Sequence, residues 1–433
     1  MKFPGQRKIK HYFPVNADNR FDRESVAFGH VNTYVTGIDQ NIVDITAQVD
    51  DNLLAEFGLQ KGISQLFANN DTAERLYTYL LNHNLIEEEF AGGTIGNTLH
   101  NYSVLADDCS IQFGVMSENI VVGTSAYRYL CNTSSKVDLT HLQPVAGALG
   151  RAFALITPDG ERTFGISSGR MNELCEQYIP EDVIVEGSAL LLCAYTLANP
   201  DLPIYDATIK AAKAAKASGV PVVLTMGSHQ MVAARREEFS AFLREYVSVA
   251  AMNEEEAAAL TGLNDPLLAS EKALDMVDMV LLTAGPEGLY LSGYSDRELL
   301  RQSSNPIRSG SISDFNRYEF SRPMLRSDCA DPVKVYAQID PYMGGPERIS
   351  NTNGAGDGAL AAVVHDIAAN DFHRRVLPAS VKHGKCYLTY SSFAQVCKYA
   401  NRVSYQVLAQ SSPRLSRGLP EREDSLEEAY WSR

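Results

Sequence analysis

The sequence lacks the marks of a membrane-spanning or secreted protein. No stretch reaches the roughly eighteen apolar residues that a membrane helix needs, and the N-terminal segment MKFPGQRKIKHYFP has no apolar core of signal-peptide length. The seven cysteines are odd in number and widely spaced, and none forms a C-x-x-C pair. This disfavours a disulfide framework and a structural zinc site. We therefore expect a cytoplasmic protein without a membrane partner.

Positive charge is also scarce. Thirty-eight Lys and Arg stand against fifty-three Asp and Glu, which gives a formal net charge of −15, and the nearest approach to a basic block is the segment RKIK at 7–10. Such a balance argues against a nucleic-acid partner held through phosphates. The histidines show no i, i+4 pairing, so none is assigned to a metal or to catalysis. The sequence has no G-x-x-x-x-G-K-[ST] segment, so any ATP site must be of another kind.

The periodicity of the chain predicts an α/β fold. Near-continuous apolar runs separated by helical stretches are typical of a mostly parallel sheet with helices on both faces. These runs lie at 189–195, 220–226, 247–253 and 278–284. Ligands of such sheets bind beyond the carboxyl ends of the strands. We expect an N-terminal extension over residues 1–30, a main domain over 31–410 and a C-terminal tail over 411–433.

Two segments of the main domain differ from this alternation. Residues 151–167 form two alternating runs joined by the turn sequence Pro158-Asp159-Gly160, which predicts a hairpin outside the main sheet. Such a hairpin could be an ordinary sheet edge or a lid that excludes water from a reaction. Residues 293–348 have weak periodicity and are expected to form a long irregular insertion.

The strongest chemical signal is the sequence NTNGAGDG at 351–358, which an apolar helical run follows at once. Free backbone N–H groups at a helix start bind anions, and glycines allow a ligand to approach the backbone closely. Gly354, Ala355 and Gly356 are therefore expected to form an anion hole for a phosphate under attack. Asp357 lies in the first helical turn and is expected to accept the proton of the attacking hydroxyl. A capped helix start without chemistry is the alternative.

Six segments in order along the chain resemble motifs of the ribokinase-like (pfkB) family of carbohydrate and purine kinases. They are GIDQNIVD at 37–44, AGGTIGN at 91–97, DGERTF at 159–164, NEEE at 253–256, TAGPEG at 283–288 and TNGAGDG at 352–358. The resemblance extends over residues 34 to 410. It implies an α/β fold in which a central, mostly parallel sheet flanked by helices carries a small β lid.

The resemblance also assigns roles to individual residues. The expected substrate-binding residues are Asp39, Gln40, Asp44, Gly92, Gly93, Thr94, Asn97 and Arg162. The expected ATP-binding residues are Asn253, Thr283, Gly285, Gly288, Asn353 and Asn401, and Glu256 is expected to act on magnesium through water. Simpler explanations remain open for six of them. Asp44 could cap a turn, Asn97, Asn253 and Glu256 could each cap a helix start, Arg162 could be an exposed hairpin charge, and Asn401 could belong to a plain core helix.

The whole chain resembles the purine-nucleoside kinases of the family, including its C-terminal sequence PRLSRGLPERED. This resemblance implies transfer of the γ-phosphate of ATP to the 5′-hydroxyl of inosine or guanosine, with Mg²⁺ as cofactor. Family members also suggest activation by a monovalent cation and a homodimer. Two alternatives remain: a kinase of the same fold that acts on a free sugar, with a smaller pocket beside Asp44 and Asn97, and a nucleoside-binding sensor without turnover.

Overall fold

The protein is built on a nine-stranded, mostly parallel sheet. The computed structural model describes residues 33–303, 312, 315–350 and 352–419, so the expected N-terminal extension lies outside it. In spatial order the strands are β16 (Pro332–Ile339), β15 (Leu289–Asp296), β14 (Met279–Thr283), β13 (Val249–Asn253), β12 (Val222–Thr225), β11 (Leu190–Cys193), β1 (Tyr34–Ile38), β5 (Cys109–Phe113) and β7 (Val137–Asp138). All neighbouring pairs from β14 to β7 are parallel, while β14–β15 and β15–β16 are antiparallel.

Helices cover both faces of this sheet, which explains why its strands are apolar without alternation. Along β11, Leu190 and Leu192 belong to one buried cluster, whereas Leu191 and Cys193 belong to another on the opposite face. One face is covered by α4 (Thr94–Ala106), α12 (Ala355–Val376) and α13 (Phe393–Leu408). The other face is covered by α6 (Glu181–Glu186), α7 (Pro203–Ala217), α8 (His229–Ala234), α9 (Arg236–Tyr246), α10 (Glu254–Thr261) and α11 (Pro266–Ala273).

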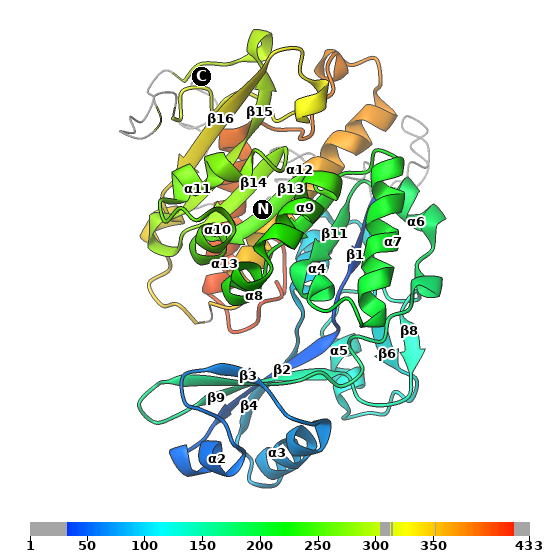
Figure 1. Ribbon diagram of the computed structural model, residues 1–433, viewed down its shortest axis with the longest axis vertical. Helices are drawn as coiled ribbons and strands as arrows, with labels where there is room; N and C mark the ends of the chain where they lie inside the picture. The colour runs from blue at the N-terminus through cyan, green and yellow to red at the C-terminus, as the bar shows by residue number, and fades with distance from the viewer. Residues whose placement is uncertain (1–32, 304–311, 313–314, 351, 420–433) are drawn as a thin grey trace, which may run out of the picture.

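A second sheet of five strands lies below the first in Figure 1. Its order is β3 (Ser64–Leu66), β10 (Arg162–Ser167), β9 (Gly150–Ile156), β2 (Ile42–Gln48) and β4 (Ile86–Ala91). Its lower face packs on α2 (Asp51–Glu56) and α3 (Asn70–Asn82). Smaller elements nearby are β6 (Val115–Ser117), β8 (Gln143–Val145) and α5 (Ser125–Cys131). Residues 39–41 join β1 directly to β2, so the chain passes from the large sheet to the small one within three residues.

The hairpin expected at 151–167 is formed by β9 and β10, which pair antiparallel from Arg151 with Ser167 to Ile156 with Arg162. It belongs to the small sheet and not to the large one. Alternation along β2 places Val43 and Ile45 in the buried core, while Ile42 and Asp44 line a cavity on the other side. The small sheet therefore has one face covered by helices and one face turned toward the large sheet.

Two boundary expectations need correction. Residues 293–348 are not wholly irregular, because β15 continues to Asp296 and β16 pairs with it along its whole length. The period was hidden because both strands bury residues on the two faces of the sheet, so polar and apolar residues do not alternate, and because a long connection separates the strands. The expected tail 411–433 is packed over its first part: Pro413, Arg414 and Leu415 are buried.

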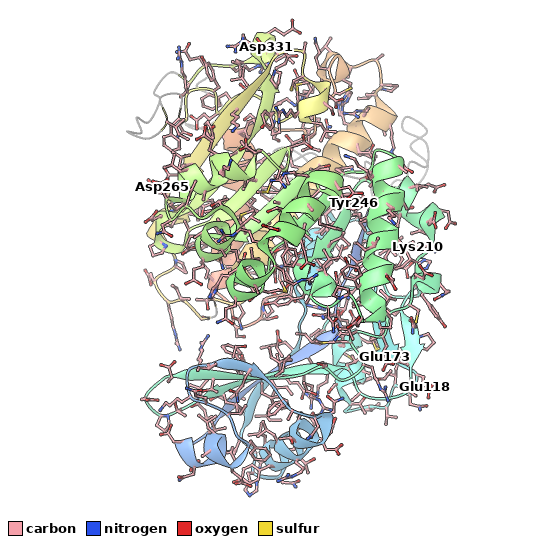
Figure 2. The ribbon with its side chains drawn as sticks, in the orientation of Figure 1. Glu118, Glu173, Lys210, Tyr246, Asp265 and Asp331 are labelled. Atoms are coloured by element: carbon pink, nitrogen blue, oxygen red, sulfur yellow. The ribbon has the colours of Figure 1, made fainter. Side chains whose placement is uncertain are left out.

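The acidic excess lies on the outside of the molecule. Figure 2 shows Glu118, Asp265 and Asp331 at its periphery, and all three are exposed. Among the described residues, no helix is both long and apolar enough to cross a membrane.

Candidate functional site

A cavity of about 1220 Å³ opens between the small sheet and the carboxyl edge of the large one. Its walls come from the lid strands, from the loops after β12, β13 and β14, and from the start of α12. The expected site residues that line it are Asp39, Gln40, Asp44, Gly93, Thr94, Asn97, Asn253, Glu256, Thr283, Gly285, Gly288, Asn353, Gly354, Ala355, Gly356, Asp357 and Asn401. Residues as distant in the sequence as Asp39 and Asn401 thus face one space.

The glycine-rich segment forms the start of α12. Gly354 is the N-cap and has φ of 79°, and a Cβ atom there would lie 2.4 Å from Cβ of Pro413. Only glycine adopts this conformation without strain. A Cβ at Gly356, by contrast, would meet no protein atom within 4 Å. The space beside Gly356 therefore stays open for a ligand, next to backbone N–H groups that have no partner inside the helix.

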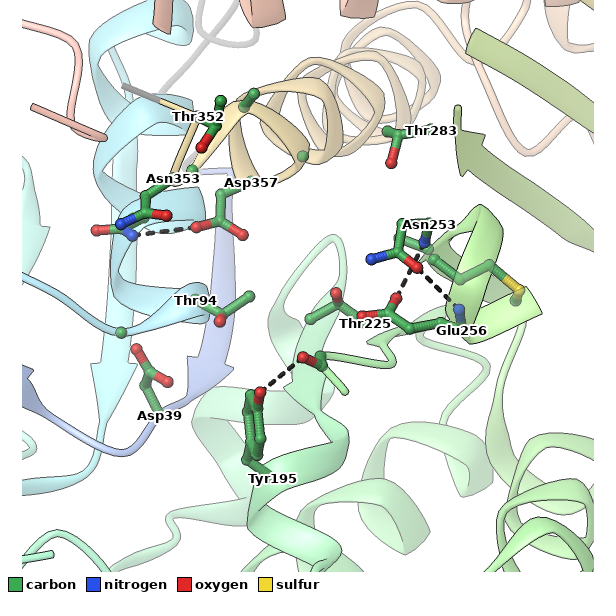
Figure 3. Close-up of a pocket in the computed structure, with 18 of the residues that line it drawn as sticks. Asp39, Thr94, Tyr195, Thr225, Asn253, Glu256, Thr283, Thr352, Asn353 and Asp357 are labelled. Carbon is green, nitrogen blue, oxygen red and sulfur yellow. Dashed lines mark hydrogen bonds between the residues drawn. The ribbon is translucent and has the colours of Figure 1, made fainter. Parts of the chain in front are cut away.

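Asp357 stands in the first turn of α12 and contacts Asn97 of α4. The Asn97 Nδ2 group donates to Asp357 Oδ2 over 3.0 Å, although the two residues are 260 positions apart. Figure 3 shows the Asp357 side chain pointing into the cavity between Asn353 and Thr94. Burial raises the pKa of Asp357 to about 7, while the hydrogen bond from Asn97 lowers it. The carboxylate thus has a pKa suited to accepting a proton near neutral pH.

Two further carboxylates lie near Asp357. Asp39 accepts the backbone N–H of Gly96 over 2.6 Å and that of Gln40 over 2.9 Å, so it also caps the start of α4. Burial raises the pKa of Asp39 to about 7 and that of Asp44 to about 6. Both negative charges raise the pKa of Asp357. The ionised forms of Asp39 and Asp44 therefore disfavour ionisation of Asp357.

Gly92 and Arg162 do not line the cavity. Gly92 lies behind it: a Cβ there would lie 2.6 Å from the Asp44 carboxyl group, so glycine lets Asp44 pack against β4. Arg162 is exposed and begins β10 beside the turn, at the end of the hairpin away from the cavity. Ile166, four residues further along the same strand, lines the cavity instead. A contact between Arg162 and a phosphate would therefore require the lid to move.

The residues expected at the ATP end serve partly as helix caps. Asn253 and Glu256 form a capping box at the start of α10, in which Asn253 Oδ1 accepts the Glu256 N–H over 2.8 Å and Glu256 Oε2 accepts the Asn253 N–H over 3.0 Å (Figure 3). Both still line the cavity beside Thr283. Burial raises the pKa of Glu256. The capping explanation and a role toward a ligand are therefore compatible at these positions.

Asn401 holds a wall of the cavity in place. Its side-chain amide donates to the carbonyl of Asp340 over 2.7 Å and accepts the N–H of Tyr342 over 3.2 Å. Pro341 and Tyr342 themselves line the cavity. The side chain of Asn401 thus shapes the loop after β16, although α13 is otherwise a core helix.

Sequence reasoning missed several residues at the site. Met171, Asn172 and Tyr195 line the cavity near the lid, and Asn172 Oδ1 accepts a hydrogen bond of 2.5 Å from Gln40 Nε2. The Tyr195 hydroxyl donates to the carbonyl of Gly227 over 2.6 Å. Arg414 was also missed; it is buried, and its Nε donates to Asn97 Oδ1 over 3.0 Å. No local pattern marks these positions, since their partners come from distant segments.

The structure joins two of the six motifs, because Asp357 at a glycine-rich helix start accepts a hydrogen bond from Asn97 of a second glycine-led helix. The sequence model of pfkB family carbohydrate kinases matches residues 121–308. The chain is 58% identical over 438 residues to guanosine-inosine kinase of Escherichia coli K12, with full coverage of both chains. The chain belongs to the pfkB family. The expected kinase activity is thereby confirmed, and membership of this kinase family implies the use of ATP and Mg²⁺.

Solved structures show the same fold. Adenosine kinase from Sinorhizobium meliloti matches with a TM-score of 0.63 and 23% identity, covering 90% of this chain and 98% of its own. Arabidopsis thaliana ribokinase complexed with ribose and ATP matches with a TM-score of 0.53 and 16% identity, covering 88% and 94%. These likenesses confirm that this pfkB protein has the ribokinase-like α/β fold.

Proposed function

We propose that this pfkB kinase transfers the γ-phosphate of ATP to the 5′-hydroxyl of a purine nucleoside, inosine or guanosine. The observation that carries the proposal is the hydrogen bond between Asn97 and Asp357 at the open start of α12. It orients a base of suitable pKa that stands in the first turn of an anion-binding helix, as phosphoryl transfer to an alcohol requires. The full-length relative of 58% identity, named guanosine-inosine kinase, supports the choice of acceptor.

The geometry accounts for each part of such a reaction. Asp357 Oδ2 is engaged by Asn97, which orients the carboxylate, and the substrate hydroxyl gives its proton to this group as the phosphate is transferred. The backbone N–H groups of Gly354, Ala355 and Gly356 stabilise the negative charge on the phosphoryl oxygens. The small sheet forms one wall of the cavity, and its approach to the large sheet would exclude the water that competes with the hydroxyl.

The size of the cavity favours a nucleoside over a free sugar. A volume of about 1220 Å³ exceeds the roughly 300–1,000 Å³ of a site for one drug-sized ligand, so there is room for a nucleoside beside ATP. Ile42, Ala152, Ile166 and Met171 add an apolar wall near Asp44 that a purine ring could cover. A binding protein without turnover has no need of an oriented base, so Asp357 also argues against a sensor.

The proposal also includes a magnesium ion, a monovalent cation, an oligomeric state and a cellular location. Among the described residues no group of three or more His, Cys, Asp and Glu side chains could hold a metal ion. Mg²⁺ bound mainly by phosphates and water, with Glu256 acting through a water molecule, fits this donor set. When bound, Mg²⁺ neutralises phosphate charge. Activation by a monovalent cation and a homodimer are proposals from the resemblance, and a cytoplasmic location is a proposal from the sequence. Potassium titration, light scattering and cell fractionation can test them.

The test is a substrate panel. Purified protein with Mg²⁺ and ATP is given inosine, guanosine, adenosine, cytidine, ribose or fructose, and ADP release is measured beside Asp357→Asn as control. Turnover of inosine or guanosine that collapses in the variant supports the proposal. Turnover of free sugars alone would move the assignment to a sugar kinase, and no turnover with any acceptor would favour the sensor.

A further inference from the structure

The segment 412–415, here called the C-terminal strap, ties the two catalytic helices together. Leu415 N–H donates to Asn101 Oδ1 over 2.8 Å, and Asn101 Nδ2 donates to the Pro413 carbonyl over 3.1 Å. Pro413 also lies against Gly354, at the start of α12. The strap thus contacts α4 on one side and the anion hole on the other.

His100 strengthens this attachment. Its Nδ1 accepts the N–H of Ser134 over 3.0 Å, so the proton lies on Nε2, which donates to the carbonyl of Leu415 over 3.0 Å. Burial lowers the pKa of His100 to about 4, and the nearby charge of Arg414 also acts to lower it. The imidazole therefore stays neutral at physiological pH, and the position of the strap does not depend on its titration.

Arg414 carries the contact from the strap to the site. Its side chain is buried, with 4% exposure, and does not line the cavity. Besides Asn97 Oδ1, it donates from Nη1 to Thr133 Oγ1 over 2.6 Å and from Nη2 to the Gly92 carbonyl over 3.1 Å. The Tyr129 ring lies beneath the guanidinium, 5.0 Å from its central carbon. These contacts fix the guanidinium in one place.

A guanidinium has hydrogen-bond donors only, and this decides the orientation of the Asn97 amide. The amide oxygen must face Arg414, so the NH₂ group must face Asp357. A reversed amide would turn its oxygen toward the carboxylate and its NH₂ toward the guanidinium. Two acceptors would then face each other at one end and two donors at the other. Asn97 is itself buried, with 5% exposure, so few other partners can reach its amide.

Arg414 is also the positive charge that the three carboxylates of the site share. Its charge lowers the pKa of Asp39, Asp44 and Asp357, against the burial that raises all three. The neighbouring carboxylates oppose this effect, because the charges of Asp39 and Asp44 raise the pKa of Asp357. The charge of Asp357 in turn raises the pKa values of Cys193 and Tyr195.

We propose that Arg414 is a positioning residue for the base, which holds the Asn97 amide so that it donates to Asp357 and keeps the carboxylate ready for the substrate hydroxyl. The inference rests on the proposed kinase function. It gives the C-terminal strap a role in turnover although Arg414 does not itself line the cavity. The residue acts through Asn97 and its charge, not by touching the substrate.

The test compares three variants of the full chain by steady-state kinetics with saturating Mg-ATP and varied inosine between pH 6 and pH 9. Arg414→Met should lower kcat about ten- to a hundredfold. It should also move the acid limb of kcat/KM upward by about one pH unit, because the positive charge that lowers the pKa of Asp357 is lost. Arg414→Lys keeps the charge but cannot reach all three partners, so kcat should fall while the acid limb stays near its original position. Arg417→Met, at an exposed position close to the strap, is the matched control.

Chemical rescue adds a readout that a purely structural role would not give. Methylguanidinium at millimolar concentration should restore part of the kcat of Arg414→Ala, whereas urea, which has a similar shape and no charge, should not. If Arg414→Met does not fold, Arg414→Lys and the rescue experiment decide. The proposal would be overturned if Arg414→Lys and Arg414→Met kept the kcat and the acid limb of the unmodified protein. A rise in KM in these variants without a change in kcat would also overturn it. Absence of nucleoside turnover by the unmodified protein would instead overturn the proposed function.

Discussion

Replacing Asp357 by Asn should make the protein more stable and nearly inactive at the same time. The folded-state pKa of Asp357 is raised from 3.8 to about 7, mainly by burial. Between these values the folded state binds more protons than the unfolded state, so the free energy of unfolding decreases as the pH rises through this window. At pH 8 the full penalty corresponds to about 4 kcal/mol as an upper limit, and sharing of protons with Asp39 and Asp44 reduces it.

An asparagine side chain at this position would be neutral and could still accept the hydrogen bond from Asn97. We therefore expect Asp357→Asn to gain about 1–3 kcal/mol of unfolding free energy at pH 8 and to lose about 10²–10⁴-fold in kcat. Urea unfolding at pH 8 and pH 5 measures the first effect, which should shrink at the lower pH because Asp357 is then protonated in the folded protein. ADP release measures the second. A variant that is less stable at pH 8, or that keeps a tenth of the activity, would refute the reasoning.

Three further predictions concern the same cavity. Gly354→Ala should lose both stability and activity, because the residue has a positive φ and its Cβ would collide with Pro413. Gly356→Ala has open space around its Cβ, so it should unfold like the unmodified protein while its kcat falls at least tenfold. Losses of stability and kcat in Gly356→Ala that equal those in Gly354→Ala would contradict this. Asn97→Leu should remove one hydrogen-bond partner from Arg414 and one from Asp357 and cost about 2–4 kcal/mol of unfolding free energy in urea. Asn97→Asp should instead place a second carboxylate against Asp357 and shift the acid limb of kcat/KM upward. Glu256→Gln should keep the capping box and raise the magnesium concentration needed for half-maximal rate. The control is Glu255→Gln, at the exposed neighbouring position. An unchanged magnesium requirement would show that Glu256 does not act on the metal.

The sequence by itself determined the sheet and the centre of the site. The four apolar runs correspond to β11, β12, β13 and β14, because a strand buried on both faces must be apolar throughout. The segment 352–358 indicated an anion-binding helix start because glycines followed by an acid and a long apolar helix are a local pattern. The periodicity of 293–348 was too weak to reveal β16, since Tyr336 is buried on one face and Val335 and Ala337 on the other, so the strand shows no simple alternation.

Only the tertiary structure decided which groups meet around Asp357. Asn97 reaches it from 260 positions away, and Arg414 reaches Asn97 from 317 positions away. A hydrogen bond between such residues depends on how α4, α12 and the strap pack, and no local propensity encodes that packing. Packing also showed that Arg162 lies at the far end of its hairpin and that Asn401 holds a loop. The residues proposed to perform the chemistry lie in local motifs that the sequence shows, whereas those proposed to orient them become visible only when distant segments are brought together.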